Sequence, residues 1–277
     1  MAAGAKKGGG GKPDLATLGG LLLAVGGIIG GFLLEGGSVG KMLAPTAAMI
    51  VLGGTLGAVM ITTPLAVLIR AAKAMGAVFF ERTQPVSAVI EQIVEYATKA
   101  RKNGIVSLEE EAAALKDPFL GKALTLAVDG TDLDELRKMM ELEIEVEEHQ
   151  VEAEAKVFEA AGGYSPTIGI IGAVLGLIQT MQHLADIEEV GKGIATAFVA
   201  TIYGVGAANI FFLPAGGKIR ARGQAGTHLK EMMLEGVVSI VEGMNPKLIR
   251  GKLEAYAHLE FAKPEKKSEG EPEEPAK

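Results

Sequence analysis

Two apolar segments, residues 166–184 and 193–213, carry hydroxyl and amide side chains but no Asp, Glu, Lys or Arg. Ionisable groups inside a membrane are the usual mark of proton relays and ion pathways. A pair of neutral segments therefore cannot bind and release a proton at mid-membrane by itself. We expect either that the chain transports no ion or that a second chain supplies the carboxylate.

Thr201 is the polar residue of these segments with the best claim to a hydrated path. It lies mid-segment in ATIYGVG, between small residues that would let a partner approach. The alternative for any membrane threonine is a hydrogen bond back to a carbonyl of its own helix, and the residues leave both interpretations open. His183, near the end of the first segment, is interpreted more simply as an interfacial residue than as a proton relay.

Pro166 and Pro214 stand at one end of each apolar segment. Proline suits a helix start and can terminate a helix, so one interpretation is that the two prolines only mark helix boundaries. The other interpretation is a flexible joint that transmits a change at the membrane to the aqueous part of the chain. The residues alone favour helix boundaries.

A group of charged residues offers both signs within a short stretch of sequence. Its members are Arg101, Lys102, Glu109 and Glu110. The plain interpretation is the solvated end of one helix and the start of the next. The functional alternative is a docking patch, which gives a partner specificity and fast exchange more than tight affinity.

Several function classes are disfavoured by what the sequence lacks. It has no phosphate-binding G-x-x-x-x-G-K-[ST] loop, no dinucleotide-binding G-x-G-x-x-G and no HExxH motif. Without cysteine there is no disulfide or thiolate metal site. The net charge of −7 argues against nucleic-acid binding. We expect neither an enzyme nor a resident cofactor.

The composition indicates a membrane part joined to a substantial aqueous part. The 277 residues are 48% hydrophobic, with a mean hydropathy of +0.29, yet 22% are charged. A helix of about 20 apolar residues crosses a hydrocarbon core, and such stretches occur at about 14–34, 42–61, 166–184 and 193–213. The second is expected to kink at residues 62–64 and to continue as helix to about residue 80.

The residues between the second and third apolar stretches show helical rather than membrane-length periodicity. Helices are expected over about 86–102, from Ser107 onward, over 119–128 and over 133–161. Residues 141–147 alternate as a half-buried strand would, but their flanks are good helix formers, which favours a helix. Residues 215–263 read as amphipathic helix interrupted near residue 245.

Basic residues near the helix ends set the expected orientation, with both termini and the central segment cytoplasmic. They are Lys6, Lys7, Lys12, Arg70, Lys73, Arg82, Lys218, Arg220 and Arg222. The expected domains are a disordered cytoplasmic N-terminus at 1–13, membrane helices one and two within 14–64, a cytoplasmic helical domain at 65–163, membrane helices three and four within 164–214, cytoplasmic C-terminal helices at 215–263 and a disordered tail at 264–277. The predicted fold class is an all-α membrane protein with four transmembrane helices and a helical cytoplasmic domain inserted between helices two and three.

This pattern resembles the MotA/PomA family of flagellar stators over nearly the whole chain apart from its ends. The motifs that carry the resemblance are PTIGIIGAVLGLIQTM and GKGIATAFVATIYGVGAANIFFLP in the last two membrane helices and DPFLGKALTLAVDGTD in the aqueous segment. The related ExbB/TolQ proteins share the last two helices but look like three-helix proteins. The two N-terminal helices here therefore favour MotA.

The resemblance implies a stator subunit of the bacterial inner membrane that converts ion-motive force into torque. It implies a pentameric ring of this chain around a single-span MotB or PomB partner, whose membrane Asp carries the ion, and a cytoplasmic domain that pushes on the rotor protein FliG. The borrowed Asp agrees with the carboxylate that this chain lacks.

The resemblance also assigns roles to particular residues. It makes Pro166 and Pro214 the residues that couple ion flow to conformational change. The residues assigned to the rotor contact are Arg101 and Glu109, with Lys102 and Glu110 as their neighbours. The sequence departs from the pattern at Ala112, where some members carry an acid.

The ion is predicted from three positions. Sodium-driven members carry Thr where this chain has Ala173, and a Thr pair where it has Ala200 and Thr201. A sodium ion wants several oxygen ligands, whereas a proton needs only a carboxylate and a water path. With Ala at two of these positions we predict protons, with sodium as the alternative.

Other functions stay open beside the stator. One is an ExbB/TolQ-like energiser of envelope transport, and another is a membrane scaffold that conducts no ion. A self-sufficient channel is disfavoured, because no charge lies inside the predicted membrane helices.

Overall fold

The computed structural model describes residues 12–81, 85–182 and 184–259, and these are almost entirely helical. His183, nearly all of the predicted N-terminal tail and the whole C-terminal tail lie outside the described residues. By contact the chain divides into two compact units. The first unit combines Met1–Thr83 with Glu143–Thr227, and the second combines Gln84–Leu142 with His228–Lys277.

The first membrane helix is confirmed as α1, Leu15–Leu34. The carboxylate of Asp14 caps its start by accepting from the backbone N–H of Thr17 at 3.0 Å. A short antiparallel pair precedes it, β1 (Lys12–Pro13) with β2 (Phe80–Glu81). The prediction of disorder up to residue 13 is therefore wrong for these two residues, because their pairing partner lies far along the chain.

The second span is less regular than predicted. A 3₁₀ turn η1 (Val39–Met42) leads into α2 (Pro45–Ala48), a π-helical stretch η2 (Met49–Gly53) and α3 (Gly54–Thr62). Thr63 then adopts an extended backbone (φ −129°, ψ 130°) before α4. The chain breaks here rather than kinking, because the residue before a proline disfavours helical geometry.

Helix α4 (Leu65–Phe79) buries one face in the core of the first unit. That core joins α3, α4, α8 and α10. Its buried members are Val59, Ala71, Val78, Ala155, Val157, Phe158, Ala161, Ala215 and Ile219. Arg220 fastens α10 to α8 through Glu152 (2.7 Å) and Glu159 (2.5 Å).

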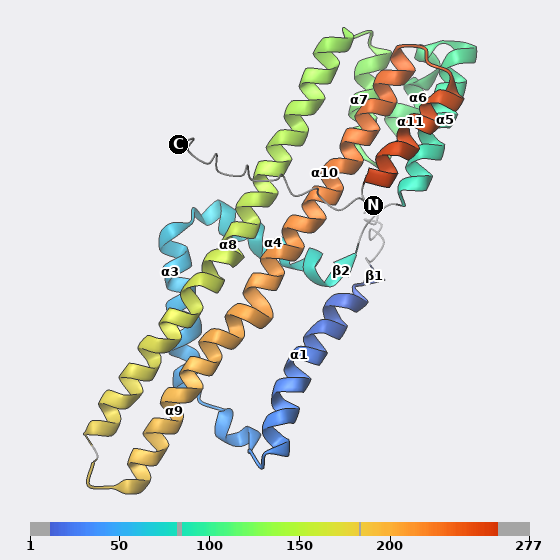
Figure 1. The fold of residues 1–277 in the computed structure, drawn as a ribbon. Coiled ribbons are helices and arrows are strands. Elements are labelled where there is room, and N and C mark those ends of the chain that lie inside the picture. The colour runs from blue at the N-terminus through green and yellow to red at the C-terminus, as the bar shows by residue number, and fades with distance from the viewer. Residues whose placement is uncertain (1–11, 82–84, 183, 260–277) are drawn as a thin grey trace, which may run out of the picture. The chain divides into compact units, whose positions relative to one another are not determined.

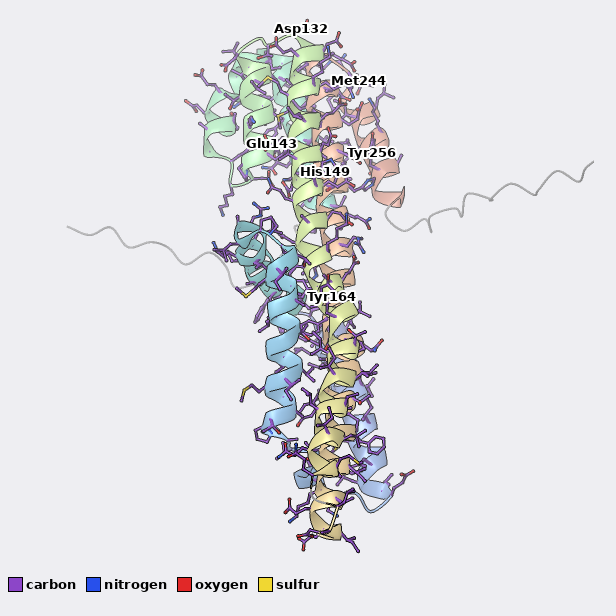
Figure 2. The ribbon with its side chains drawn as sticks, turned by 90° about the vertical axis from the view of Figure 1, so that its left-hand side faces the viewer. Asp132, Glu143, His149, Tyr164, Met244 and Tyr256 are labelled. Atoms are coloured by element: carbon purple, nitrogen blue, oxygen red, sulfur yellow. The ribbon has the colours of Figure 1, made fainter. Side chains whose placement is uncertain are left out.

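The third apolar segment forms the end of α8, one 49-residue helix spanning Leu133–Met181. The predicted helix end at residue 161 is wrong, and Figure 2 shows the helix continuing past Tyr164. Helix α9 (Ile187–Gly206) begins six residues before the predicted position 193, where the Asp186 carboxylate accepts from the N–H of Glu188 at 3.0 Å. The chain then passes through the π-helical η4 (Ala207–Phe212) into α10 (Leu213–Val241).

The second unit holds helices where the sequence predicts them between the second and third apolar stretches and after the fourth. They are α5 (Val86–Asn103), the 3₁₀ turn η3 (Ile105–Leu108), α6 (Glu109–Ala114), α7 (Pro118–Val128), the start of α8, the end of α10 and α11 (Pro246–Leu259). Residues 141–147 are helical, with Ile144 buried. Ser107 does not cap α6 as expected, because its hydroxyl donates to the carbonyl of Gly104 at 2.7 Å.

Four of the described helices are long and apolar enough to cross a membrane. Their ranges are Leu15–Leu34, Pro45–Thr62, Leu133–Met181 and Ile187–Val241. The domain limits predicted from the sequence mark where the chain enters and leaves the membrane. The two contact-based units are divided on a different basis, so these domain limits stay predictions.

Candidate functional site

The end of α8 and the length of α9 pack against each other through small residues, a contact that we call the seam. Its members are Gly169, Gly172 and Gly176 on α8 and Ala197, Ala200 and Gly204 on α9. A Cβ added to Gly169 would come within 3.0 Å of the Ala200 carbonyl oxygen and 3.1 Å of the Gly204 Cα. Small residues let membrane helices approach this closely. Figure 1 shows the two helices, yellow and gold, side by side.

Ala200, one of the predicted ion-path residues, lies inside the seam. It is buried, and it packs near Ala47 of α2 and against Gly172. A Cβ on Gly172 would sit 3.1 Å from the Ala200 methyl. Ala200 therefore shapes the helix contact, and a second chain cannot touch it without opening that contact.

Thr201 and Ala173 are half-buried at positions adjacent to seam residues. The other threonines of the two predicted segments donate to their own helix. These bonds run from Thr167 to the carbonyl of Tyr164 (2.8 Å), from Thr180 to Gly176 (2.9 Å) and from Thr196 to Lys192 (3.0 Å). The Thr201 hydroxyl makes no hydrogen bond to any residue that the structure describes. Its hydroxyl is thus left available to water, an ion or another chain.

Tyr203 is a residue whose role the sequence did not reveal. Its hydroxyl donates to the carbonyl of Met42 at 2.5 Å and accepts from the N–H of Ala44 at 3.3 Å. These bonds hold the entry to α2 against α9. A tyrosine in an apolar segment was the available signal, because a buried phenol usually finds a hydrogen-bond partner.

Helical backbone continues through both prolines, so their interpretation as helix boundaries is wrong. Pro166 has no N–H to donate to the carbonyl of Gly162. A Cβ on Gly162 would come 2.5 Å from the side chain of Leu213, which directly precedes Pro214. Pro166 itself lies one turn further along α8, next to Ser165, which packs against Gly204 of α9, so the two prolines lie at different levels of the packed helices. Pro214 lies two residues after the end of the π-helical η4, and π-helical stretches often mark functional sites.

The surroundings of Pro166 leave one further polar group without a partner. Ser165 is fully buried, and its hydroxyl makes no hydrogen bond within the described residues. Its carbonyl oxygen lies 2.5 Å from the position that a Cβ on Gly204 would take. The contact below Pro166 thus depends on glycine at 204.

The four predicted rotor-facing charges gather around the turn η3. All four are exposed. Arg101 and Lys102 end α5, and Glu109 and Glu110 begin α6. Cations at a helix C-terminus and acids at a helix N-terminus also stabilise the helices themselves. The placement is therefore equally consistent with solvated helix ends that bind no partner.

Residues next to this charged patch hold α5 and α6 together. An ion pair between Lys99 and Glu111 joins α5 to α6, and the hydrogen bond from Lys99 lowers the pKa of Glu111. Gly104 turns the chain with φ +82°, and Val106 stands 63% exposed between the charges. Ala112 is buried, so its methyl group belongs to the packing of α6.

A buried carboxylate was missed by the sequence analysis. Asp14 precedes the span of α1 and accepts from Lys218 Nζ at 2.6 Å and from the Arg222 guanidinium. Arg222 also donates to the carbonyls of Ala77 and Phe80, the latter at 2.6 Å. The hydrogen bonds from Lys218 and from the Thr17 N–H hold the pKa of Asp14 well below its usual range.

Family models match most of the chain. Residues 111–232 match the MotA/TolQ/ExbB proton channel family, and residues 18–104 match the motility protein A N-terminal family. Motility protein A of Bacillus subtilis is 34% identical over 94% of this chain and 98% of its own length. Chemotaxis protein PomA of Vibrio alginolyticus is 32% identical over 88% of this chain and 95% of its own length.

Two solved structures share the fold. The C. jejuni MotAB structure matches with a TM-score of 0.85 and 31% identity, over 88% of this chain and 95% of that chain. The flagellar MotAB stator complex from Bacillus subtilis matches with a TM-score of 0.82 and 34% identity, over 90% of this chain and all of that chain.

Proposed function

Because this chain belongs to the motility protein A family, we propose that it is the stator subunit of a flagellar motor that converts ion-motive force into torque. It does so together with a MotB-type single-span partner in the bacterial inner membrane. The structural relatives are MotAB complexes, which supports such a partner. The match of residues 18–104 to the motility protein A N-terminal model favours a stator over an ExbB/TolQ-like energiser.

One observation carries the proposal. The two apolar segments, residues 166–184 and 193–213, contain no Asp, Glu, Lys or Arg, and the Thr201 hydroxyl has no partner among the described residues. A hydroxyl can guide a hydrated ion, whereas taking up and releasing a proton needs a group that titrates. The partner's membrane Asp supplies that group. The ion passes at the edge of the seam, along Thr201 and Ala173, while the buried Ala200 sets the spacing of the two helices.

The translocated ion is the proton. Ala173 and Ala200 offer methyl groups where a sodium site needs oxygen ligands, and Thr201 alone gives one hydroxyl. No cofactor takes part. Swimming that persists without sodium at fixed proton-motive force is the expected result, and swimming that stops without sodium would overturn this assignment.

Torque passes from the seam through the joint that Pro166 and Pro214 form. Each proline removes one helix hydrogen bond, and the π-helical η4 precedes Pro214, so this region is easier to bend than the regular helix on either side. The exposed charges Arg101, Lys102, Glu109 and Glu110 meet the rotor protein FliG. The chain assembles as a pentameric ring around the partner. Both termini and the helices between the second and third spans lie in the cytoplasm. The membrane spans are in contact with lipid.

The test is co-expression with a cognate MotB-type partner in a paralysed strain. Restored swimming is expected, with loss of swimming when the partner's membrane Asp becomes Asn and slower swimming when Thr201 becomes Val. Thr196→Val is the matched control, since the Thr196 hydroxyl is already bonded to its own helix. Failure to swim with an assembled complex, or equal swimming of all variants, would contradict the proposal.

A further inference from the structure

A cavity of about 360 Å³ opens between α1, the end of α4, η4 and the start of α10, all within the first unit. Its walls are mainly apolar. They include Leu21 of α1, Phe79 of α4, Phe211 of η4 and Pro214 of α10. The volume falls in the range of ligand pockets, roughly 300–1,000 Å³.

One end of this cavity is charged. Lys218 lines it, and the same ammonium group is bonded to the buried Asp14. Arg222 shares that carboxylate, so this cluster holds two positive charges and one negative charge. An ammonium has three N–H donors, and Asp14 takes one of those on Lys218. The cluster therefore carries a surplus positive charge that favours an anion.

Helix α1, which forms one wall, has no buried residue. Leu22 and Leu23, for example, are 75% and 79% exposed. An apolar slot beside such a helix is a poor site for water, since water needs several polar partners. Within a membrane the material at hand is the acyl chain of a lipid.

We infer that this cavity binds one anionic phospholipid, with an acyl chain in the apolar slot and the phosphate at Lys218. This inference rests on the membrane location proposed above and adds a ligand to it. A phospholipid is the chemistry that meets both observations, because it joins a long apolar chain to a phosphate. An apolar helix from a second copy would fill the slot but leave the surplus positive charge without a partner.

The position of the site gives the lipid a mechanical consequence. The slot is lined by Pro214 and by residues of η4. An acyl chain there supports the coupling joint from the side of α1. Lipid composition should therefore alter how well the stator transmits torque.

The inference is tested on the complex of the full chain with its partner, purified and exchanged into lipid nanodiscs that contain phosphatidylglycerol and phosphatidylethanolamine. Native mass spectrometry then counts the phospholipid of each class that each complex retains. Gly20→Leu places a side chain in the slot. A Cβ on Gly20 meets nothing within 4 Å, so the cavity itself accepts the substitution.

Gly27→Leu is the matched control. It makes the same change one heptad further along α1, also with nothing within 4 Å of the added Cβ, and Gly27 does not line the cavity. We expect about a tenfold lower occupancy by phosphatidylglycerol in Gly20→Leu and wild-type occupancy in Gly27→Leu. Lys218→Gln should keep a bound lipid and lose the preference for phosphatidylglycerol.

Equal retention in wild type and Gly20→Leu, or equal loss in both α1 variants, would overturn the inference. A wild-type complex that shows no preference for the anionic lipid would overturn it too. Because the chain has no cysteine, a single Leu21→Cys reports the rival occupant. Disulfide-linked dimers through position 21 would show that helix α1 of a second copy lies against the slot. The readout is bound lipid, so it stands apart from whether the strain swims.

Discussion

The seam between α8 and α9 and the charged patch around η3 are built on opposite principles. The seam excludes charge and brings backbones so close that a methyl group at Gly169 would press on a carbonyl. The patch presents exposed charges of both signs on two helix ends. Shape therefore controls the seam and electrostatics controls the patch. Substitutions in the seam should be severe and insensitive to salt, whereas those in the patch should be graded and reversible by charge.

The largest expected effect is that of Gly169→Ala. Its Cβ would lie 3.0 Å from the Ala200 carbonyl oxygen, and such overpacking costs about 1–3 kcal/mol. The matched change Gly163→Ala, on the same helix with nothing within 4 Å, should instead stabilise the helix by about 0.5–1 kcal/mol. Thermal unfolding of the purified complex compares the two. Effects of the same sign would break the account of the seam.

Thr201→Val comes next, because it keeps the shape of the side chain and removes only the hydroxyl. Losing one hydrogen bond to a hydrated ion costs about 1 kcal/mol, which is about a fivefold loss of ion flux. Proton flux into vesicles that carry the complex measures it. Unchanged flux with an intact complex would show that the hydroxyl faces no path.

Some of these helices could be predicted from the sequence, and others could not. Periodicity and caps predicted the helix over about 86–102, the start of α8 at residue 133 and the interruption near residue 245, because these depend on neighbouring residues. The passage of α8 through Pro166 was not predictable, since the packing of a 49-residue helix offsets the one hydrogen bond that proline removes.

Long-range partners explain the remaining misses. Asp14 finds Arg222 across 208 positions of sequence, and no local pattern encodes that contact. The residues at the edge of the seam were predicted from the resemblance, but the sequence could not tell that Ala200 is buried while the Thr201 hydroxyl stays free. That distinction depends on how α2 and α8 pack against α9.

A smaller effect is expected for Arg101→Glu in the patch. One exposed charge contributes modestly to an interface, so swimming should slow roughly two- to fivefold. Changing the facing acid on the rotor protein to Lys should restore the speed, and Lys138→Glu at an exposed position of α8 is the control for added negative charge. Rescue tracked in a swimming assay supports docking. A loss of speed that no charge reversal on the rotor restores would argue against it.

The smallest effect concerns the ion pair between Lys99 and Glu111. Its hydrogen bond lowers the pKa of Glu111 in the folded state from an ordinary value of 4.5. The stabilisation is therefore present above the unfolded pKa and is lost as the pH falls through the folded pKa. Glu111→Gln should lower the unfolding midpoint slightly at neutral pH, and the gap from wild type should close in acid. A gap that stays constant with pH would contradict this assignment.

The central claim is that a neutral seam guides an ion but must borrow the acid that carries it. Proton flux into liposomes that hold this chain alone, or this chain with its single-span partner, tests that claim most directly. The account predicts no flux from the chain alone, flux from the complex, and loss of that flux when the partner's membrane Asp becomes Asn. Proton conduction by this chain without any partner would contradict it.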